Sequence, residues 1–99
     1  MSVMVELLAD DQIAEAKAAR PHWDVVGAAF VRTVELASFP QAIEAVNRVA
    51  EIAEDMNHHP DIDIRWRTLK FSVSTHSKGG ITSNDVALID RIDSVLAEL

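Results

Sequence analysis

The chain has 99 residues, of which 48% are hydrophobic, so it can form a hydrophobic core and does not belong to the apolar-poor disordered class. We expect a single domain over residues 1–99. Its 16 acidic and 9 basic residues give a formal net charge of −7, which excludes the basic surface that direct nucleic-acid binding requires. Cysteine is absent, which excludes a disulfide framework, a thiolate nucleophile and a cysteine-ligated zinc site.

The N-terminus has neither the basic region nor the apolar length of a signal peptide. No apolar run in the chain approaches the roughly 20 residues of a transmembrane helix. We therefore expect a cytoplasmic protein that does not bind a membrane.

Asp10 and Asp11 predict the start of a first helix, because acidic side chains interact favourably with the N-terminal end of the helix dipole. Pro21 ends this helix. Residues 23–26 then form a short strand, and Gly27-Ala28 a turn into a second strand over residues 30–36. The second strand has one apolar face, interrupted by Arg32, which is made by Phe30, Val34 and Leu36.

The clearest element is a helix that begins after Ser38, the predicted N-cap, with Gln41 at the capping-box position. Pro40 falls in the first turn, where a missing N–H is tolerated. The helix should stop before Pro60, since the residue before a proline avoids the helical region. The helical spacing is carried by Phe39, Ala42, Ile43, Val46, Val49, Ala50, Ala53 and Met56.

Two half-buried strands follow, joined by a tight turn at Arg67-Thr68, and Gly79-Gly80 ends the second of them. Their alternating apolar residues are Ile62, Ile64 and Trp66, then Leu69, Phe71 and Val73. Thr82 opens a last helix, whose apolar face carries Leu88, Ile92, Val95 and Leu99. The order α-β-β-α-β-β-α predicts an α+β fold in which helices pack on one face of a four-stranded antiparallel sheet.

Three histidines lie at the ends of regular elements: His58 and His59 after the long helix, and His76 after a strand. Histidine is the side chain best suited to move protons near neutral pH. Glu54 lies one helical turn before His58, so the two can be neighbours. Asp85 lies just inside the last helix. A carboxylate beside an imidazole can orient it and tune its charge.

Each of these residues also has a structural interpretation. Adjacent histidines often form a polar helix end that suits the helix dipole. Asp85 is three residues after Thr82, which is the spacing of a capping box. Glu54 alone would be a solvated helix residue, and Trp66 at strand spacing is typical of a core residue. His22 has no evident partner, and we interpret it as structural.

The same histidines also raise the possibility of a metal site. His58, His59, His76 and an acid would supply enough ligands, but adjacent side chains point apart and no His-x-His or His-x-x-x-His spacing is present. A Ser-based triad lacks the Gly-x-Ser-x-Gly elbow. We therefore expect neither a metal nor another cofactor.

The spaced set Glu54-x-x-x-His58-His59-Pro60, Trp66, His76, Gly79-Gly80-Ile81-Thr82 and Asp85 resembles the pterin-4a-carbinolamine dehydratase family. That family is also known as the dimerisation cofactor of a homeodomain transcription factor. The resemblance runs from about residue 23 to the C-terminus, and the predicted element order agrees with it. Two departures are Ser77, where the family often has an acid after the histidine, and His22, where glycine often precedes the first tryptophan.

The resemblance implies elimination of water from a 4a-hydroxytetrahydropterin to give the quinonoid dihydropterin, without metal or cofactor. It implies that His58 and His76 serve as acid and base, that His59 holds the pterin, and that Glu54 and Asp85 orient and charge-tune the histidines. The resemblance also leaves an alternative, a protein-interaction module that acts as a transcriptional coactivator. A homodimer or homotetramer is expected, because a four-stranded sheet has edge strands and the long helix has a wide apolar stripe.

Overall fold

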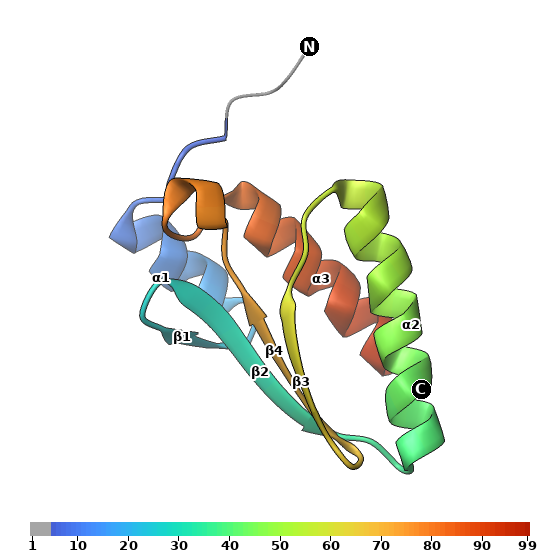
Figure 1. Cartoon of the computed structure of the whole chain (residues 1–99). Coiled ribbons are helices and arrows are strands. Elements are labelled where there is room, and N and C mark those ends of the chain that lie inside the picture. Colours follow the sequence, from blue (N-terminus) through green and yellow to red (C-terminus); the bar gives the residue numbers. More distant parts are fainter. Residues whose placement is uncertain (1–4) are drawn as a thin grey trace.

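The computed structural model describes residues 5–99 and confirms the α+β order. The helices are α1 (Asp10–Ala18), α2 (Phe39–Met56) and α3 (Ser83–Ala97), with a short 3₁₀ helix η1 (His76–Lys78). The strands are β1 (Asp24–Val26), β2 (Ala29–Glu35), β3 (Asp61–Arg65) and β4 (Thr68–Val73). They form one antiparallel sheet in the order β1-β2-β4-β3, and the helices cover one of its faces (Figure 1).

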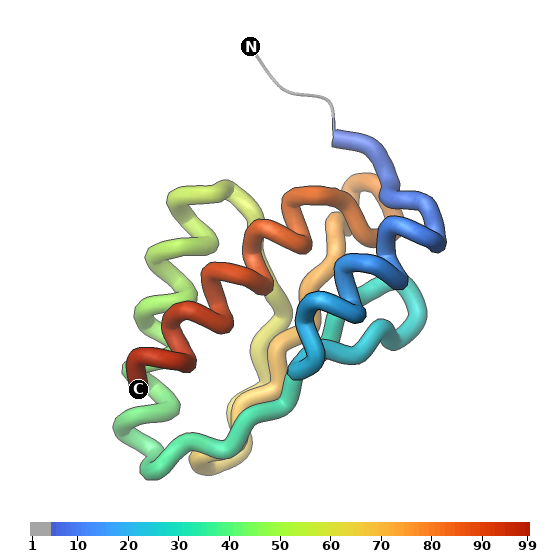
Figure 2. Tube along the Cα trace, turned by 180° about the vertical axis from the view of Figure 1, so that it is seen from behind, coloured from blue at the N-terminus to red at the C-terminus, as the bar shows by residue number. Residues whose placement is uncertain are grey.

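Helix α3 runs between α1 and α2 across the back of the sheet, as Figure 2 shows. Its contact with the segment after α1 includes a two-point ion pair. Arg20 Nε and a terminal guanidinium nitrogen donate to the two carboxylate oxygens of Asp90, at 2.7 and 2.9 Å. The hydrogen bond to Asp90 raises the pKa of Arg20 above its ordinary value.

The hydrophobic core lies between the sheet and the helices. The sequence patterns predicted all four strands and the three α-helices that surround this core. Its largest fully buried apolar side chains are Trp23, Phe30, Phe71, Leu69, Leu88, Ile89 and Ile92. Burial of large apolar side chains is the dominant favourable contribution to folding. The alternation in β4 and the helical spacing in α3 therefore correctly predict which faces are buried.

Arg32, which interrupts the apolar face of β2, lies on the helix side of the sheet and is largely buried. Its guanidinium donates to Asp93 Oδ1 of α3 at 2.5 Å, and the Trp23 indole N–H donates to the same oxygen at 2.8 Å. A buried charge needs such a partner, because leaving it unpaired would cost several kcal/mol, on the order of 3–5. Arg32, which interrupts the apolar face, therefore links β2 to α3 through its ion pair with Asp93.

The start of α2 is as expected at Ser38 and differs at Gln41. Ser38 Oγ accepts a hydrogen bond from the Gln41 backbone N–H at 3.2 Å. The Gln41 side chain, however, accepts from the backbone N–H of Ala37 at 2.8 Å, one residue before the N-cap. In place of the expected reciprocal capping box, the Gln41 side chain bonds to the residue before the N-cap and so satisfies a backbone N–H that precedes the helix.

The turn between β3 and β4 lies one residue earlier than the sequence predicts. Arg65 pairs with Thr68, so Trp66 and Arg67 form the turn. Trp66 has a positive φ of 54° and its side chain is 69% exposed, so the prediction that it is a strand and core residue is wrong. A two-residue hairpin turn requires positive φ at its first central position, which takes Trp66 out of the strand alternation. The Arg67 guanidinium lies over the Trp66 ring, 4.8 Å from its centroid.

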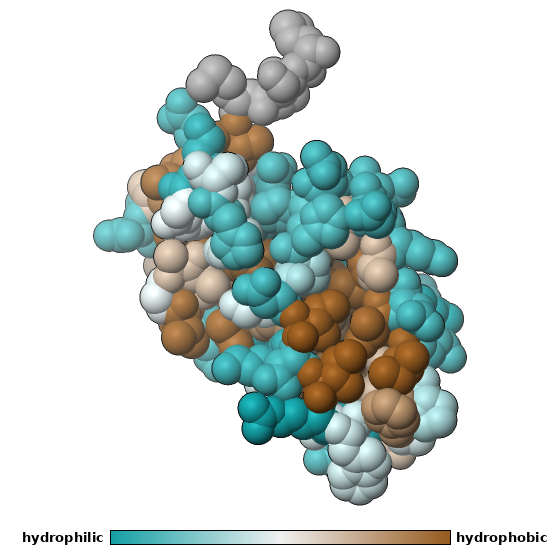
Figure 3. Space-filling view, in the orientation of Figure 1, coloured by the Kyte–Doolittle hydropathy of each residue, from teal (hydrophilic) through white to brown (hydrophobic). Residues whose placement is uncertain are grey.

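The surface is divided between a polar end and an apolar area. Apolar side chains gather where β3 lies beside α2, and hydrophilic residues predominate at the upper right of the molecule in Figure 3. Ile64 of β3 and Phe39 of α2 are 43% and 47% exposed. No helix within residues 5–99 has the length and apolar character needed to cross a membrane.

Candidate active site

The histidines of interest lie at one end of the molecule, where three chain segments converge. The C-terminal end of α2, the 3₁₀ helix η1 and the N-terminal end of α3 all reach the upper end in Figure 1. His58 and His59 follow α2, His76 begins η1, and Asp85 lies in the first turn of α3. Antiparallel pairing of β3 with β4 returns the chain from the hairpin tip to this end.

His58 and Asp85 form the central contact of the site. His58 Nε2 lies 2.5 Å from Asp85 Oδ1. The His58 side chain is 11% exposed and the Asp85 side chain is completely buried. Asn57 ends α2 in the left-handed conformation, with φ 49°, and His58 leaves the helix axis there. The imidazole is therefore held against α3 in a fixed position.

The second carboxylate oxygen of Asp85 accepts two further hydrogen bonds. Asp85 Oδ2 accepts from the Thr82 backbone N–H and from the Thr75 hydroxyl, each at 2.8 Å. The hydroxyls of Thr75 and Thr82 are 2.7 Å apart. The capping box between Thr82 and Asp85 is present, so Asp85 caps α3 and binds His58 at the same time. The capping interpretation is confirmed, and the role of Asp85 in catalysis stays a prediction.

Glu54 pairs with His59 and not with His58, contrary to the sequence expectation. His59 Nε2 lies 2.5 Å from Glu54 Oε2, and both side chains are more than half exposed. The helical i,i+4 geometry that would join Glu54 to His58 is lost because the chain turns at Asn57. Each of the two adjacent histidines therefore has its own carboxylate partner: Asp85 for His58 and Glu54 for His59.

His76 is the most exposed of the three histidines. Its Nε2 lies 3.9 Å from Asp61 Oδ2, at the start of β3, and both side chains are about 70% exposed. His76 follows Thr75 directly, and the Thr75 hydroxyl contacts the carboxylate that holds His58. His76 therefore follows directly the residue whose hydroxyl contacts the carboxylate partner of His58.

Backbone hydrogen bonds hold the loop that carries His76 at both of its ends. The Thr75 backbone N–H donates to the Gly80 carbonyl at 2.8 Å, and the N–H of Leu8 donates to the Ile81 carbonyl at 2.9 Å. A Cβ at Gly80 would lie 2.9 Å from a methyl group of Leu7, so a larger residue there would require the Leu7 side chain to move. The segment before α1 therefore helps to hold the loop between η1 and α3.

Sequence reasoning missed Thr75 and Asp61 as members of the site. Thr75 could have been found, because it continues the inward-facing alternation of Leu69, Phe71 and Val73 and is therefore a polar residue at a buried position. Asp61 carries no comparable signal, since it lies among other charged strand residues. His22 is exposed in the connection after α1, outside the site. Within the described residues 5–99 there is no group of three or more side chains placed to hold a metal ion.

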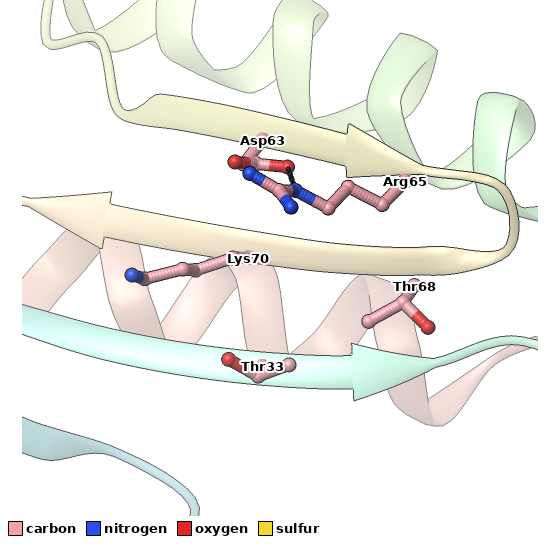
Figure 4. A pocket seen from close by; sticks show the side chains of 5 residues that line it. All are labelled: Thr33, Asp63, Arg65, Thr68 and Lys70. Atoms are coloured by element: carbon pink, nitrogen blue, oxygen red, sulfur yellow. Dashed lines mark hydrogen bonds and ion pairs between the residues drawn. The ribbon is translucent and has the colours of Figure 1, made fainter.

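The helix-free face of the sheet carries two hollows. A hollow of about 180 Å³ is lined by Thr33, Asp63, Arg65, Thr68 and Lys70 (Figure 4). An adjoining hollow of about 290 Å³ shares Asp63 and Lys70 and extends along β3 to Asp61. Both are shallow and lined mainly by charged and hydroxyl side chains. The second one leads to the carboxylate that faces His76.

Three helices on one face of a four-stranded antiparallel sheet, with imidazole–carboxylate pairs at one end, define the class of this α+β protein. The family model described as "Pterin 4 alpha carbinolamine dehydratase" matches residues 6–95. The chain belongs to this family.

Curated relatives agree with this assignment, and a solved structure has the same fold. A protein of Nocardia farcinica, provisionally named a pterin-4-alpha-carbinolamine dehydratase, is 54% identical over 90 residues, which are 91% of this chain and 95% of the relative. A protein of Mycolicibacterium smegmatis with the same provisional name is 45% identical, over 93% of this chain and 98% of its own. The crystal structure of a transcriptional coactivator/pterin dehydratase from Brucella melitensis has the same fold. Its TM-score is 0.88 at 24% identity, over 91% of this chain and 98% of that chain.

Proposed function

We propose that this protein removes water from a 4a-hydroxytetrahydropterin to give the quinonoid dihydropterin, by general acid–base catalysis with histidine. The observation that carries the proposal is the pair of His58 and the buried Asp85, beside His76 at the same end of the fold. Membership of the pterin dehydratase family supports the substrate class.

The reaction needs one proton donor and one proton acceptor. The C4a–O bond breaks as the leaving hydroxyl takes up a proton and departs as water. The proton on N5 is removed, and its bonding electrons form the N5–C4a double bond. The uptake and the loss of a proton balance, so no oxidant or reductant is consumed. Two positioned imidazoles are sufficient for this chemistry, and each typically contributes about 10²–10⁴-fold in rate.

His58 and His76 differ in a way that suits separate roles. The His58 ring is largely buried and fixed by Asp85, whereas the His76 ring is exposed and only 3.9 Å from a solvated carboxylate. A fixed imidazole can meet a substrate atom with little loss of entropy on binding, and an exposed one can exchange its proton rapidly with water. We assign the proton transfers to these two side chains together.

His59 and Glu54 form a second, exposed pair next to His58. Their polar atoms lie at the surface of the site, where hydrogen bonds to an incoming ligand compete only with water. We assign His59 to holding the pterin, with Glu54 orienting its ring. No metal or bound cofactor is required by this mechanism, and we propose that none is used.

A second candidate function is that of a protein-interaction module. The Brucella melitensis structure is named a transcriptional coactivator as well as a pterin dehydratase. In this chain the exposed Ile64 and Phe39, on β3 and α2, offer an apolar surface away from the histidines. Such a surface would be used by a protein partner or by further copies of the chain, and it leaves the proposed active site free.

The direct test is a dehydration assay in which the 4a-hydroxytetrahydropterin is generated in situ by a pterin-dependent hydroxylase. We expect the protein to accelerate formation of the quinonoid product well above the uncatalysed rate. The matched control is the His22→Ala variant, which removes an exposed histidine outside the site and should retain full activity. A folded wild-type protein without acceleration would contradict the proposal and favour the interaction module.

A further inference from the structure

Thr75 occupies a position between the two histidines to which we assign proton transfer. It precedes His76 in the chain, and its hydroxyl contacts the carboxylate that holds His58. The Thr75 residue is only 8% exposed, and its partner Thr82 is completely buried. A buried hydroxyl must find both a donor and an acceptor within the protein, so the hydrogen-bond directions at this point can be worked out.

The directions follow from counting hydrogens. The Thr75 hydroxyl has a single hydrogen, which it donates to Asp85 Oδ2 at 2.8 Å. The 2.7 Å contact between the two hydroxyls must therefore take its hydrogen from Thr82. This agrees with the other contact of Thr82 Oγ1, which accepts from the Asn84 backbone N–H at 3.2 Å. The chain of hydrogen bonds runs from Thr82 through Thr75 to Asp85.

These hydrogen-bond directions bear on which atom donates in the contact between Asp85 and His58. Asp85 Oδ2 already accepts two hydrogen bonds, from the Thr75 hydroxyl and the Thr82 backbone N–H, so it has no place for a proton. The remaining oxygen, Oδ1, lies 2.5 Å from His58 Nε2. An ionised carboxylate can only accept, so with Asp85 ionised the hydrogen of this contact comes from Nε2. A neutral His58 ring that donates from Nε2 carries its lone pair on Nδ1.

We propose that Thr75 is a positioning residue that acts through Asp85. By holding Oδ2, it aims Oδ1 at His58 and keeps the neutral imidazole in the tautomer protonated on Nε2. Nδ1 is then the nitrogen of His58 that exchanges a proton with the substrate. Only this last step rests on the proposed dehydratase function, because the tautomer itself is a property of the protein without substrate.

The experiment compares the wild-type protein with Thr75→Val, which keeps the shape and removes the hydroxyl, and with Thr75→Ser, which keeps the hydroxyl. The control is Thr33→Val, an exposed threonine in β2. Long-range ¹H–¹⁵N correlation spectra report the tautomer of each histidine ring, and the His58→Gln variant assigns the His58 signals. We expect neutral His58 to be protonated on Nε2 in the wild type, the Ser variant and the control, and to be a mixture of tautomers in Thr75→Val.

The kinetic readout is the dehydration assay. For Thr75→Val we expect kcat to fall by about tenfold with KM unchanged, equivalent to about 1.4 kcal/mol in activation free energy, and for Thr75→Ser we expect kcat close to wild type. A wild-type His58 protonated on Nδ1 would overturn the proposal, even if Thr75→Val failed to fold. A folded Thr75→Val protein with the wild-type tautomer and kcat would overturn it too. A protein with the expected tautomers and no dehydratase activity would refute the proposed function and still support the positioning role of Thr75.

Discussion

His58 and Asp85 are 27 positions apart in the chain and are joined by a contact of 2.5 Å between Nε2 and Oδ1. The contact connects the end of α2 to the first turn of α3, and it places a largely buried imidazole at the polar end of the molecule. The same carboxylate caps α3. A change at either residue therefore affects both the local structure and the chemistry, and variants must be chosen to separate the two.

The first prediction concerns the two histidines of proton transfer. His58→Ala and His76→Ala should each lower kcat by about 100-fold or more, which is within the usual contribution of a general acid or base. The double variant should lose much less than the product of the two single losses, since groups that act as a unit are not additive. Steady-state kinetics measure these effects. Wild-type turnover in both folded single variants would show that the assignment is wrong.

The stability of these variants should differ from one histidine to the other. His58→Ala leaves the buried Asp85 Oδ1 without a partner, so the free energy of unfolding should fall by about 1–3 kcal/mol. His76→Ala removes a side chain that is 71% exposed, and the change should stay within about 0.5 kcal/mol. Urea denaturation of the two variants provides the measurement. Equal losses would mean that the His58–Asp85 contact contributes nothing to stability.

Asp85→Asn separates capping from catalysis. The Asn side chain can still accept hydrogen bonds through its oxygen from Thr75 and the Thr82 backbone N–H, so α3 and the fold should be retained. Its amide group would then face His58 and donate to Nε2, which forces the neutral ring into the tautomer protonated on Nδ1. We expect kcat to fall by about 100-fold or more while circular dichroism stays unchanged. Full activity in a folded Asp85→Asn protein would assign Asp85 to capping alone.

The pair of His59 and Glu54 should act through substrate binding. Because both side chains are exposed and contact each other at 2.5 Å, His59→Ala should raise KM with little change in kcat. Glu54→Gln should raise KM in the same direction by a smaller factor, since the amide can still hydrogen-bond the ring. Glu51→Gln, on an exposed position of the same helix, is the control. A large loss in kcat for His59→Ala would place His59 among the catalytic residues.

Activity should not depend on a metal ion. Elemental analysis of the purified protein should find no stoichiometric metal, and kcat should be the same before and after treatment with a strong chelator. The reason is that His58, His59 and His76 each face a different carboxylate, and within residues 5–99 no three such side chains are placed to hold a metal ion. Stoichiometric zinc whose removal abolishes activity would contradict this.

The chain should assemble into a homodimer or homotetramer. Strands β1 and β3 are the edges of the sheet, and exposed apolar side chains lie on β3 and at the start of α2 (Figure 3). Light scattering at micromolar concentration should give a mass of two or four times the 10.9 kDa of one chain. Ile64→Lys should lower that mass if β3 contributes to the interface. A monomer at every concentration tested would refute the prediction.

The sequence by itself determined the elements and the candidate residues. Local signals were enough for this: the Ser38 cap starts α2, the period of two in β4 marks its buried face, and Thr82 with Asp85 starts α3. Pro60 correctly predicted that α2 ends before it, although Asn57 ends the helix. The spaced histidines and acids were also visible, because they are defined by residue type and separation along the chain. Such features depend on neighbours within a few residues, and propensity and capping act over that range.

Only the tertiary structure decided which residues meet. Glu54 was expected beside His58, but the left-handed turn at Asn57 moves His58 to Asp85 and leaves Glu54 with His59. Thr75 joins the site because β4 and α3 pack together. These pairings depend on where the chain leaves one element and on how another element packs against it. Contacts between residues far apart in the chain are set by the packing of the whole core, which no local pattern in the sequence specifies.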